Sequence, residues 1–183
     1  MSLIRYGYAL STRRGFLSAL STALFALALL DPGAASAQAL EPVKQVKLTD
    51  KHMQGFMAAY PDMAKLYESA DPDKPDPKLH AQAEAVAKKN GFASLAEYDD
   101  VTANLTMIMS GIDPKTKKFT EPPELLRQEI AALKADKTIP DADKKQELAE
   151  LEAALKVAKP IQFKENIALV LKYYDKLSPL IQG

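Results

Sequence analysis

The sequence predicts an all-α protein, a helical bundle of five or six helices. Apolar side chains recur at steps of three and four along most of the chain, which is the period of a helix with one buried face. No segment of strand length alternates apolar and polar residues. The chain has no cysteine, so it has no disulfide or thiolate metal site, and packing must supply its stability.

The first 37 residues have the composition of a removable export signal. Arginines precede an apolar stretch over residues 15–30, and Ala35-Ser36-Ala37 provides the small residues of a signal-peptidase site. The apolar stretch is shorter than the ~20 residues that span a bilayer, so we expect no permanent membrane span. We predict a leader over 1–37, cleaved after Ala37 or, two residues later, after Ala39.

Within this leader, Thr12-Arg13-Arg14-Gly15-Phe16-Leu17 resembles the bacterial twin-arginine (Tat) motif, with Ser18 where that motif usually has lysine. The resemblance assigns signal recognition to Arg13, Arg14, Phe16 and Leu17, and cleavage to Ala35 and Ala37. It implies the Tat translocase and signal peptidase as partners of the leader. It also implies a periplasmic location for a chain that is exported already folded.

After the leader we expect an extended arm over 38–47 and then a single α-helical domain over 48–183. Thr49 can cap a first helix, and Pro61 should kink it. The predicted buried stripe of this helix consists of Met53, Phe56, Met57, Tyr60, Met63, Leu66 and Tyr67.

A proline- and aspartate-rich connector over 71–77 separates the first helix from a second over about 77–90, which Gly91 should end. The inward residues of this second helix are Leu79, Ala83, Val86 and Ala87. Ser94-Leu95-Ala96-Glu97 is a capping box that opens a third helix, ended by Gly111. The predicted buried face of the third helix is Leu95, Tyr98, Val101, Leu105, Ile108 and Met109.

The C-terminal part predicts an antiparallel helical hairpin and one last helix. Segments 123–135 and 142–158 carry leucines and isoleucine at helical spacing and are joined by a proline turn at 139–141. Residues 163–180 form the last amphipathic helix. The lysine-rich loop over 112–123 precedes the hairpin. We interpret Lys115 to Phe119 first as an ordinary solvated loop, and as the alternative a partner-contact loop with one exposed aromatic.

The segment from Leu48-Thr49-Asp50 to Tyr60, followed by Asn90-Gly91-Phe92 and Ala96-Glu97-Tyr98, is similar to a group of small exported bacterial helical domains. The similarity covers about residues 48–110. That family has no established activity, so the resemblance implies a fold and an exported location but no site.

Charge argues against a nucleic-acid partner. The chain has 24 basic and 24 acidic residues, and Arg127 is the only arginine after the leader. Nucleic-acid surfaces carry clustered arginine and lysine with a strong positive excess. We therefore expect a protein partner in the cell envelope.

Three metal or cofactor sites can be drawn from the sequence, each with a simpler interpretation. His52, Met53 and Met57 are candidate copper(I) ligands, but the methionines also lie on the apolar stripe, where adaptable core packing explains them. A b-type haem would have to use a methionine with His52 or His80. Asp71, Asp73 and Asp76 could bind calcium, but they miss the EF-hand spacing. We predict no bound cofactor.

The sequence offers no convincing catalytic set. Two histidines and no nucleophile motif leave little for covalent catalysis, and adjacent Asp99 and Asp100 diverge on a helix, which indicates a solvated face. The leading hypothesis is therefore an exported periplasmic interaction or structural module. The alternatives are a small-ligand or metal (copper or b-haem) carrier and, third, a hydrolase or other enzyme.

Overall fold

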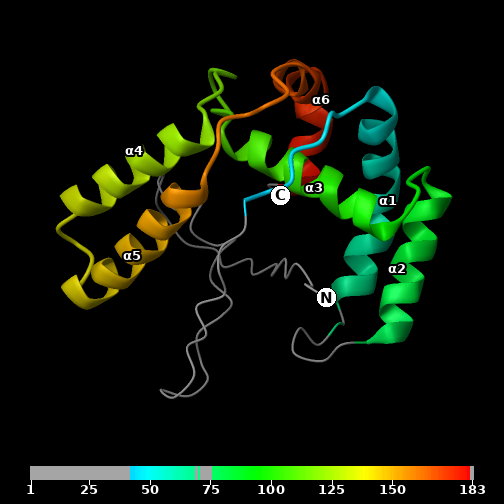
Figure 1. Cartoon of the computed structure of the whole chain (residues 1–183), viewed down its shortest axis with the longest axis horizontal. Coiled ribbons are helices and arrows are strands. Elements are labelled where there is room, and N and C mark those ends of the chain that lie inside the picture. Colours follow the sequence, from blue (N-terminus) through cyan, green and yellow to red (C-terminus); the bar gives the residue numbers. More distant parts are fainter. Residues whose placement is uncertain (1–41, 69, 71–75, 182–183) are drawn as a thin grey trace. The chain divides into compact units, whose positions relative to one another are not determined.

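The computed structural model describes residues 42–68, 70 and 76–181, and this part of the chain is built from six α-helices (Figure 1). Within these ranges no β-strand is present, so the prediction of an all-α bundle is confirmed. The predicted leader and its recognition residues lie outside the described residues. The helices are α1 (Asp50–Glu68), α2 (Pro77–Lys89), α3 (Leu95–Ser110), α4 (Pro122–Ala135), α5 (Asp141–Val157) and α6 (Glu165–Ile181).

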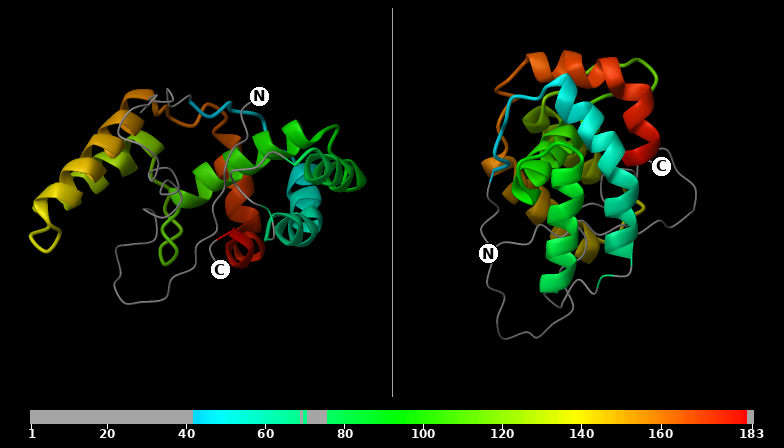
Figure 2. Two further views of the ribbon diagram at one scale, coloured as in Figure 1. Left: turned by 90° about the horizontal axis from the view of Figure 1, so that it is seen from below. Right: turned by 90° about the vertical axis from the view of Figure 1, so that its right-hand side faces the viewer.

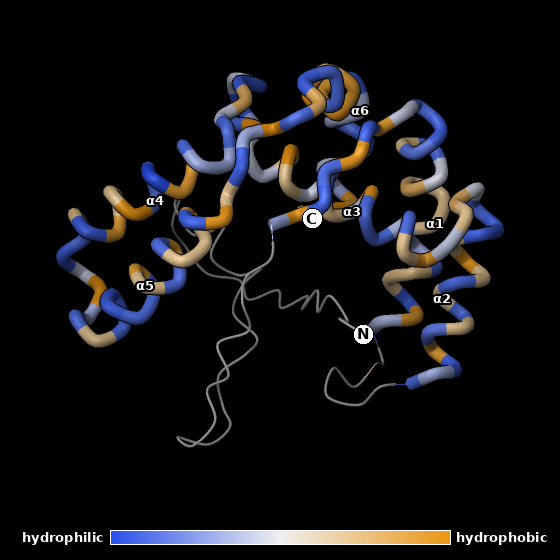
Figure 3. Tube along the Cα trace, in the orientation of Figure 1, coloured by the Kyte–Doolittle hydropathy of each residue, from blue (hydrophilic) through white to orange (hydrophobic). Residues whose placement is uncertain are grey.

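Helices α1, α2, α3 and α6 pack against one another around the main hydrophobic core (Figure 2). The described residues belong to one compact unit. Apolar and polar residues are interspersed along the described helices (Figure 3). The largest side chains buried completely in this core are Phe56, Met53, Leu105, Ile108, Met109, Leu177, Val101 and Val170.

Helix α1 begins as predicted, because the N–H of His52 donates to Thr49 Oγ1 at 3.2 Å. The helix continues through Pro61 to Glu68 without a restart. The prediction that Tyr67 belongs to the buried stripe was wrong. Its side chain is 42% exposed, because the last turn of α1 extends past the core. Gly55 is buried instead, and a Cβ there would lie 2.6 Å from the carbonyl oxygen of Asn90, so α1 and the end of α2 approach closely.

Two predicted signals at the termini of α2 and α3 are present, since Gly91 ends α2 and Ser94 caps α3, and α2 has a further cap that was not predicted. Asp76 caps α2 by accepting hydrogen bonds from the N–H groups of Lys78 and Leu79. Gly91 ends α2 with φ of +92°, a conformation that glycine adopts at little cost. Ser94 Oγ accepts from Glu97 N–H at 3.2 Å, and Glu97 Oε2 accepts from the N–H of Ala93. All six predicted face residues of α3 are buried.

Gly111 follows the last residue of α3, as predicted, but here glycine is needed for close packing and not for a left-handed backbone conformation. Gly111 has an ordinary right-handed φ of −82°, but a Cβ there would lie 2.4 Å from the carbonyl oxygen of Thr120. The loop that follows turns back, so that Ile112 and Phe119 form an isolated antiparallel bridge. Phe119 is therefore half-buried against the main core, and the prediction of an exposed aromatic was wrong.

Helices α4 and α5 form the predicted antiparallel hairpin, and each has the other as its principal helix neighbour. Ile130 and Leu133 of α4 are buried in the contact between the two helices and stand outside the main core cluster. Helix α5 has no buried residue along its length. The hairpin is thus held mainly by its own short apolar contact.

Among the described helices, none combines the length and the apolar character needed to cross a bilayer.

Candidate functional site at the N-terminal arm

The arm over residues 42–48 is held to the bundle by two buried asparagines. Asn104 of α3 accepts from Val46 N–H at 3.2 Å and donates to the Lys44 carbonyl at 2.9 Å. Asn166 of α6 accepts from Leu48 N–H at 2.9 Å and donates to the Val46 carbonyl at 2.8 Å. Each amide therefore binds one donor and one acceptor of the arm's main chain.

All four of these bonds involve main-chain groups of the even-numbered residues of the arm. In an extended chain, successive peptide groups point to opposite edges, so alternate residues share an edge. Lys44, Val46 and Leu48 turn that shared edge toward α3 and α6, where both asparagines are only 1% exposed. The arm runs as an extended segment along the helices (Figure 1), and its inner edge pairs with side-chain amides instead of a neighbouring strand.

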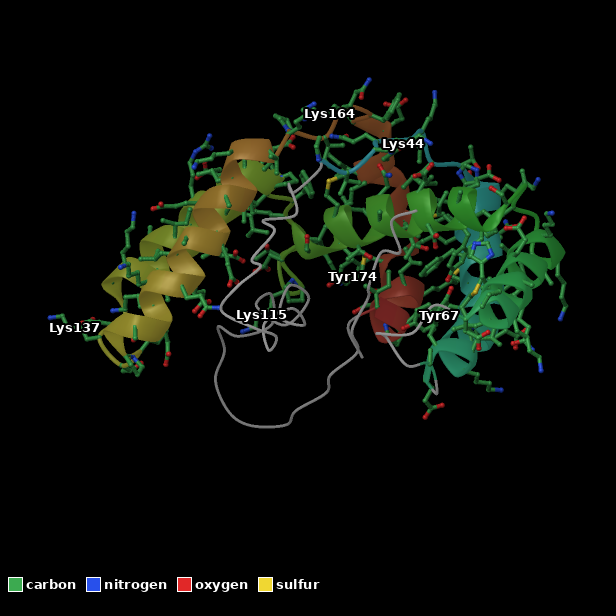
Figure 4. All side chains as sticks on the ribbon, turned by 60° about the horizontal axis from the view of Figure 1, so that its bottom comes forward. Lys44, Tyr67, Lys115, Lys137, Lys164 and Tyr174 are labelled. Atoms are coloured by element: carbon green, nitrogen blue, oxygen red, sulfur yellow. The ribbon has the colours of Figure 1, made fainter. Side chains whose placement is uncertain are left out.

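Side chains of the arm add three further anchors. Lys44 Nζ lies 2.5 Å from Asp100 Oδ2, and Lys47 Nζ lies 3.2 Å from Glu165 Oε1. Gln45 binds the segment between α5 and α6, donating to the Pro160 carbonyl at 2.9 Å and accepting from Gln162 N–H at 2.6 Å. Lys44 projects from the arm with most of its side chain exposed (Figure 4). These contacts fix the arm from both sides.

A cleft of about 300 Å³ lies between the arm, the start of α1 and the first half of α3. His52 provides the imidazole of this cleft, with Nε2 3.7 Å from Glu97 Oε1 and its ring stacked on Phe92 at 6.2 Å between centroids. His52 Nδ1 is buried without a hydrogen-bond partner, which is the one such side-chain atom among the described residues. The cleft is lined by Lys44, Val46, His52, Glu97, Asp100 and Val101, with Ser94 and Ala96.

Asp99 and Asp100 point to different surroundings, as their adjacency on a helix requires, but the interpretation as a solvated face was wrong. Asp100 pairs with Lys44 of the arm. Burial raises the pKa of the Asp99 carboxyl to about 6, and the negative charge of Asp100 adds to this shift. Burial likewise raises the pKa of Tyr67, with a further contribution from Asp99. Asp99 is therefore a half-buried carboxyl near a tyrosine.

The candidate metal ligands each make other contacts in the described structure. Met53 is fully buried in the core, Met57 is half-buried against it, and His52 faces Glu97 and Phe92. Asp76 is used as a helix cap, whereas Asp71 and Asp73 lie outside the described residues. Within the described part of the chain, no three histidine, aspartate or glutamate side chains are arranged to hold a metal ion.

The lysine-rich loop is more constrained than its composition indicates. Asp113 Oδ1 accepts hydrogen bonds from the N–H groups of Lys115 and Thr116, which closes the turn. Lys117 has φ of +56°, and its Nζ lies 3.4 Å from the centroid of the Tyr174 ring. Because the Lys117 ammonium contacts an aromatic ring of α6, it is less available to bind a partner than its place in a lysine-rich loop suggested.

Sequence reasoning missed Asn104 and Asn166 as anchoring residues. A signal was present, because each asparagine falls on the apolar face of its own helix, where a polar residue needs a partner. The identity of the partner could not be inferred, because the arm residues are 58 to 120 positions away in sequence.

Comparison with known proteins gave no match: no protein-family model, no curated protein and no solved structure is significantly similar to this chain.

Proposed function

We propose that this protein is an exported helical interaction module of the bacterial periplasm, and that the α4–α5 hairpin contacts an amphipathic helix of an envelope protein. The leader with Arg13-Arg14 and Ala35-Ser36-Ala37 supports the location. The half-buried leucines of the hairpin support the proposed contact with a partner helix.

The observation that carries the proposal is the incomplete burial of the hairpin's own apolar residues. Leu148, Leu151 and Leu155 of α5 are each half-buried, and no residue of this helix is fully buried. Two helices alone cover only one side of an apolar seam, whereas bundles surround it with three or four helices. A partner helix that lies against the seam would bury the leucines without rearranging the main core.

The surface of α5 also has a shallow hollow that suits such a contact. Leu148 and Ala149 form its apolar floor, and Lys144, Lys145 and Glu152 stand around it. Apolar centres with charged rims are the usual anatomy of protein interfaces. A partner helix with leucine-type side chains flanked by acidic and basic residues would complement this surface.

Site-specific photo-crosslinking in intact cells tests the proposal. A photoreactive residue at Ala149, exposed on the hairpin, should give one discrete adduct with an envelope protein. The same residue at Ala81, exposed on α2, should give none. Absence of an adduct at position 149, or identical adducts at both positions, would contradict the proposal.

Export is tested separately by fractionation of a Tat-competent host. The chain should be recovered from the periplasm with its N-terminus at Gln38 or Leu40. The double substitution Arg13→Lys, Arg14→Lys should retain it, uncleaved, in the cytoplasm. Periplasmic recovery of the double variant at the original level would contradict the Tat route.

A further inference from the structure

One face of helix α5 carries four exposed charged residues in alternating order, which we call the charged stripe. They are Asp141, Lys145, Glu152 and Lys156. Their spacings are four, seven and four residues, and at about 100° per residue these steps keep all four side chains within about 60° on one side of the helix. From the N-terminus of α5 to its C-terminus, the stripe is negative, positive, negative and positive.

The middle of the charged stripe is apolar. Leu148 is half-buried and Ala149 is exposed, and together they form the floor of the shallow hollow on α5. The midpoint between these two residues is also the midpoint of the stripe, since it is as far from Asp141 as from Lys156 in the sequence. The stripe therefore has opposite charges at equal distances on the two sides of its centre.

We propose that the partner helix of the hairpin is α5 of a second copy of this protein, packed antiparallel about a two-fold axis at the centre of the charged stripe. The proposal rests on the hairpin contact proposed above and names its partner. In this arrangement Lys145 faces Glu152 of the second copy. Asp141 likewise faces Lys156 of the second copy. The two-fold axis, the commonest symmetry of homodimers, makes each of these pairs occur twice.

The order of the charges favours a second copy in this orientation. Two charged stripes in parallel register would place like charges opposite one another, whereas the antiparallel arrangement pairs every charge with its opposite. The positive N-terminal end of each helix then also lies beside the negative C-terminal end of the other. An unrelated helix would need the same order of charges to match the stripe, and a second copy has that order by definition.

The apolar centre allows the two helices to approach closely. Ala149 has a short side chain, so Leu148 of one copy can pack on Ala149 of the other, and the axis repeats this contact. Leu155 is half-buried beside the stripe and gains cover from the same approach. These contacts remove from water apolar surface that the hairpin alone leaves partly exposed.

One residue of the charged stripe also has a partner within its own hairpin. Glu152 Oε1 lies 3.2 Å from Lys134 Nζ of α4. A carboxylate has two oxygens that accept hydrogen bonds, so Glu152 can bind Lys145 of the second copy without releasing Lys134. The intermolecular pair therefore adds to the hairpin's own ion pair and does not replace it.

The length of α5 sets the strength of the dimer. Its 17 residues span about 25 Å, and the charged stripe extends from the first turn to the last. A contact along one such helix lies near the lower limit of specific interfaces, ~1,200 Å². We therefore expect a reversible dimer whose formation depends on protein concentration.

Charge reversal tests the arrangement, because both members of each pair lie on the same chain. Lys145→Glu should weaken self-association about ten-fold or more, since a carboxylate then faces Glu152 of the second copy at two symmetric positions. Glu152→Lys should weaken it similarly. The double variant Lys145→Glu, Glu152→Lys exchanges the two charges and should restore association to within about three-fold of the parent chain. Sedimentation equilibrium of the chain from Gln38 measures all four proteins.

Glu150→Lys provides a matched control. It makes the same change of charge as Glu152→Lys on the same helix, but residues two positions apart point about 200° apart, so Glu150 lies on the opposite side of α5. It should change self-association by less than about two-fold. Circular dichroism should show the same helical content in every variant, so that weaker association is not caused by loss of the fold.

Failure of this inference is distinguishable from failure of the hairpin contact. A chain that stays monomeric at about 1 mM, together with an adduct from Ala149 to a different envelope protein, would retain the hairpin contact and overturn the second copy as its partner. Self-association that the double variant does not restore would also overturn the antiparallel arrangement. A self-adduct from Ala149 and recovery of association in the double variant would support it.

Discussion

Asn166 accepts a hydrogen bond of 2.9 Å from the N–H of Leu48, although 118 residues separate them in the sequence. The same side chain donates to the Val46 carbonyl, and both ends of the amide are therefore used. A short, planar side chain with one donor and one acceptor matches two groups on one edge of an extended chain. This relationship ties the first described residues of the chain to its last helix.

Asn166→Ala should lower the free energy of unfolding by about 1–3 kcal/mol, because it leaves main-chain groups of the arm without partners in a buried environment. Asn104→Ala should have a similar effect. Urea denaturation measures both. The control is Gln146→Ala, whose exposed side chain binds Glu150 within α5 and should matter by less than about 0.5 kcal/mol. Equal, small effects for all three variants would show that the asparagines do not anchor the arm.

Gly55→Ala tests the close approach of α1 and α2 by the sign of its effect. Helix propensity alone predicts that alanine stabilises an α-helix interior by about 1 kcal/mol relative to glycine. The new Cβ would lie 2.6 Å from the Asn90 carbonyl oxygen, so we expect a net loss of about 1–3 kcal/mol. Thermal unfolding distinguishes the two cases, and a raised Tm would contradict the packing that is described here.

Asp99 should make the stability of the protein depend on pH in the opposite sense to a salt-bridged carboxylate. Its pKa is raised from 3.8 to about 6 in the folded protein, so its favourable contribution is complete below pH 3.8 and is lost as pH rises through 6. Asp99→Asn should therefore stabilise the protein at pH 7.5, by about 1 kcal/mol once solvent screening at this half-exposed site is allowed for.

At pH 3.5 the Asp99→Asn variant and the parent chain should differ little, because Asp99 is then mostly protonated in both the folded and unfolded states. Carboxyls with lowered pKa, such as Asp50 beside Lys172 and Tyr173, act in the opposite direction but are common to both chains. Urea denaturation of the variant and the parent chain at pH 3.5 and pH 7.5 measures the part of the stability difference that comes from the titration of Asp99. A benefit of the substitution that is as large at pH 3.5 as at pH 7.5 would rule out titration as its cause.

The methionines of α1 separate the packing hypothesis from the copper hypothesis. Met53 is fully buried, so Met53→Ala should cost about 2–5 kcal/mol by leaving a cavity. Met57 is half-buried, and Met57→Ala should cost less. Competition titration with copper(I) should show the same affinity for Met57→Ala and the parent chain. A large drop in affinity at unchanged helical content would instead support a copper carrier.

Local sequence patterns predicted the helices well because their causes are local. Thr49 and Ser94 cap the helices they precede, and Gly91 ends α2 at positive φ. Helical periodicity also identified the buried face of α3. Such features depend on residues within a few positions of one another, so the sequence alone contains them.

Features that depend on distant segments were not predictable in the same way. Phe119 was expected to be exposed because its neighbours are lysines, but the turn at Gly111 returns it to the core. Asp99 was expected to be solvated, although the packing around α3 half-buries it. The cleft at His52 depends on where the arm docks, which in turn depends on two asparagines in different helices.

The bond between Asn166 and Leu48 also determines when the fold can be completed during synthesis. Residues near the start of the domain leave the ribosome early, but their anchoring amide is added more than a hundred residues later. Helices α1 to α3 can associate while translation continues, since domains form progressively as the chain emerges. The arm cannot complete its docking until α6 has emerged, so a nascent chain that stalls within the hairpin carries an arm anchored only by Asn104 of α3, and an incomplete core.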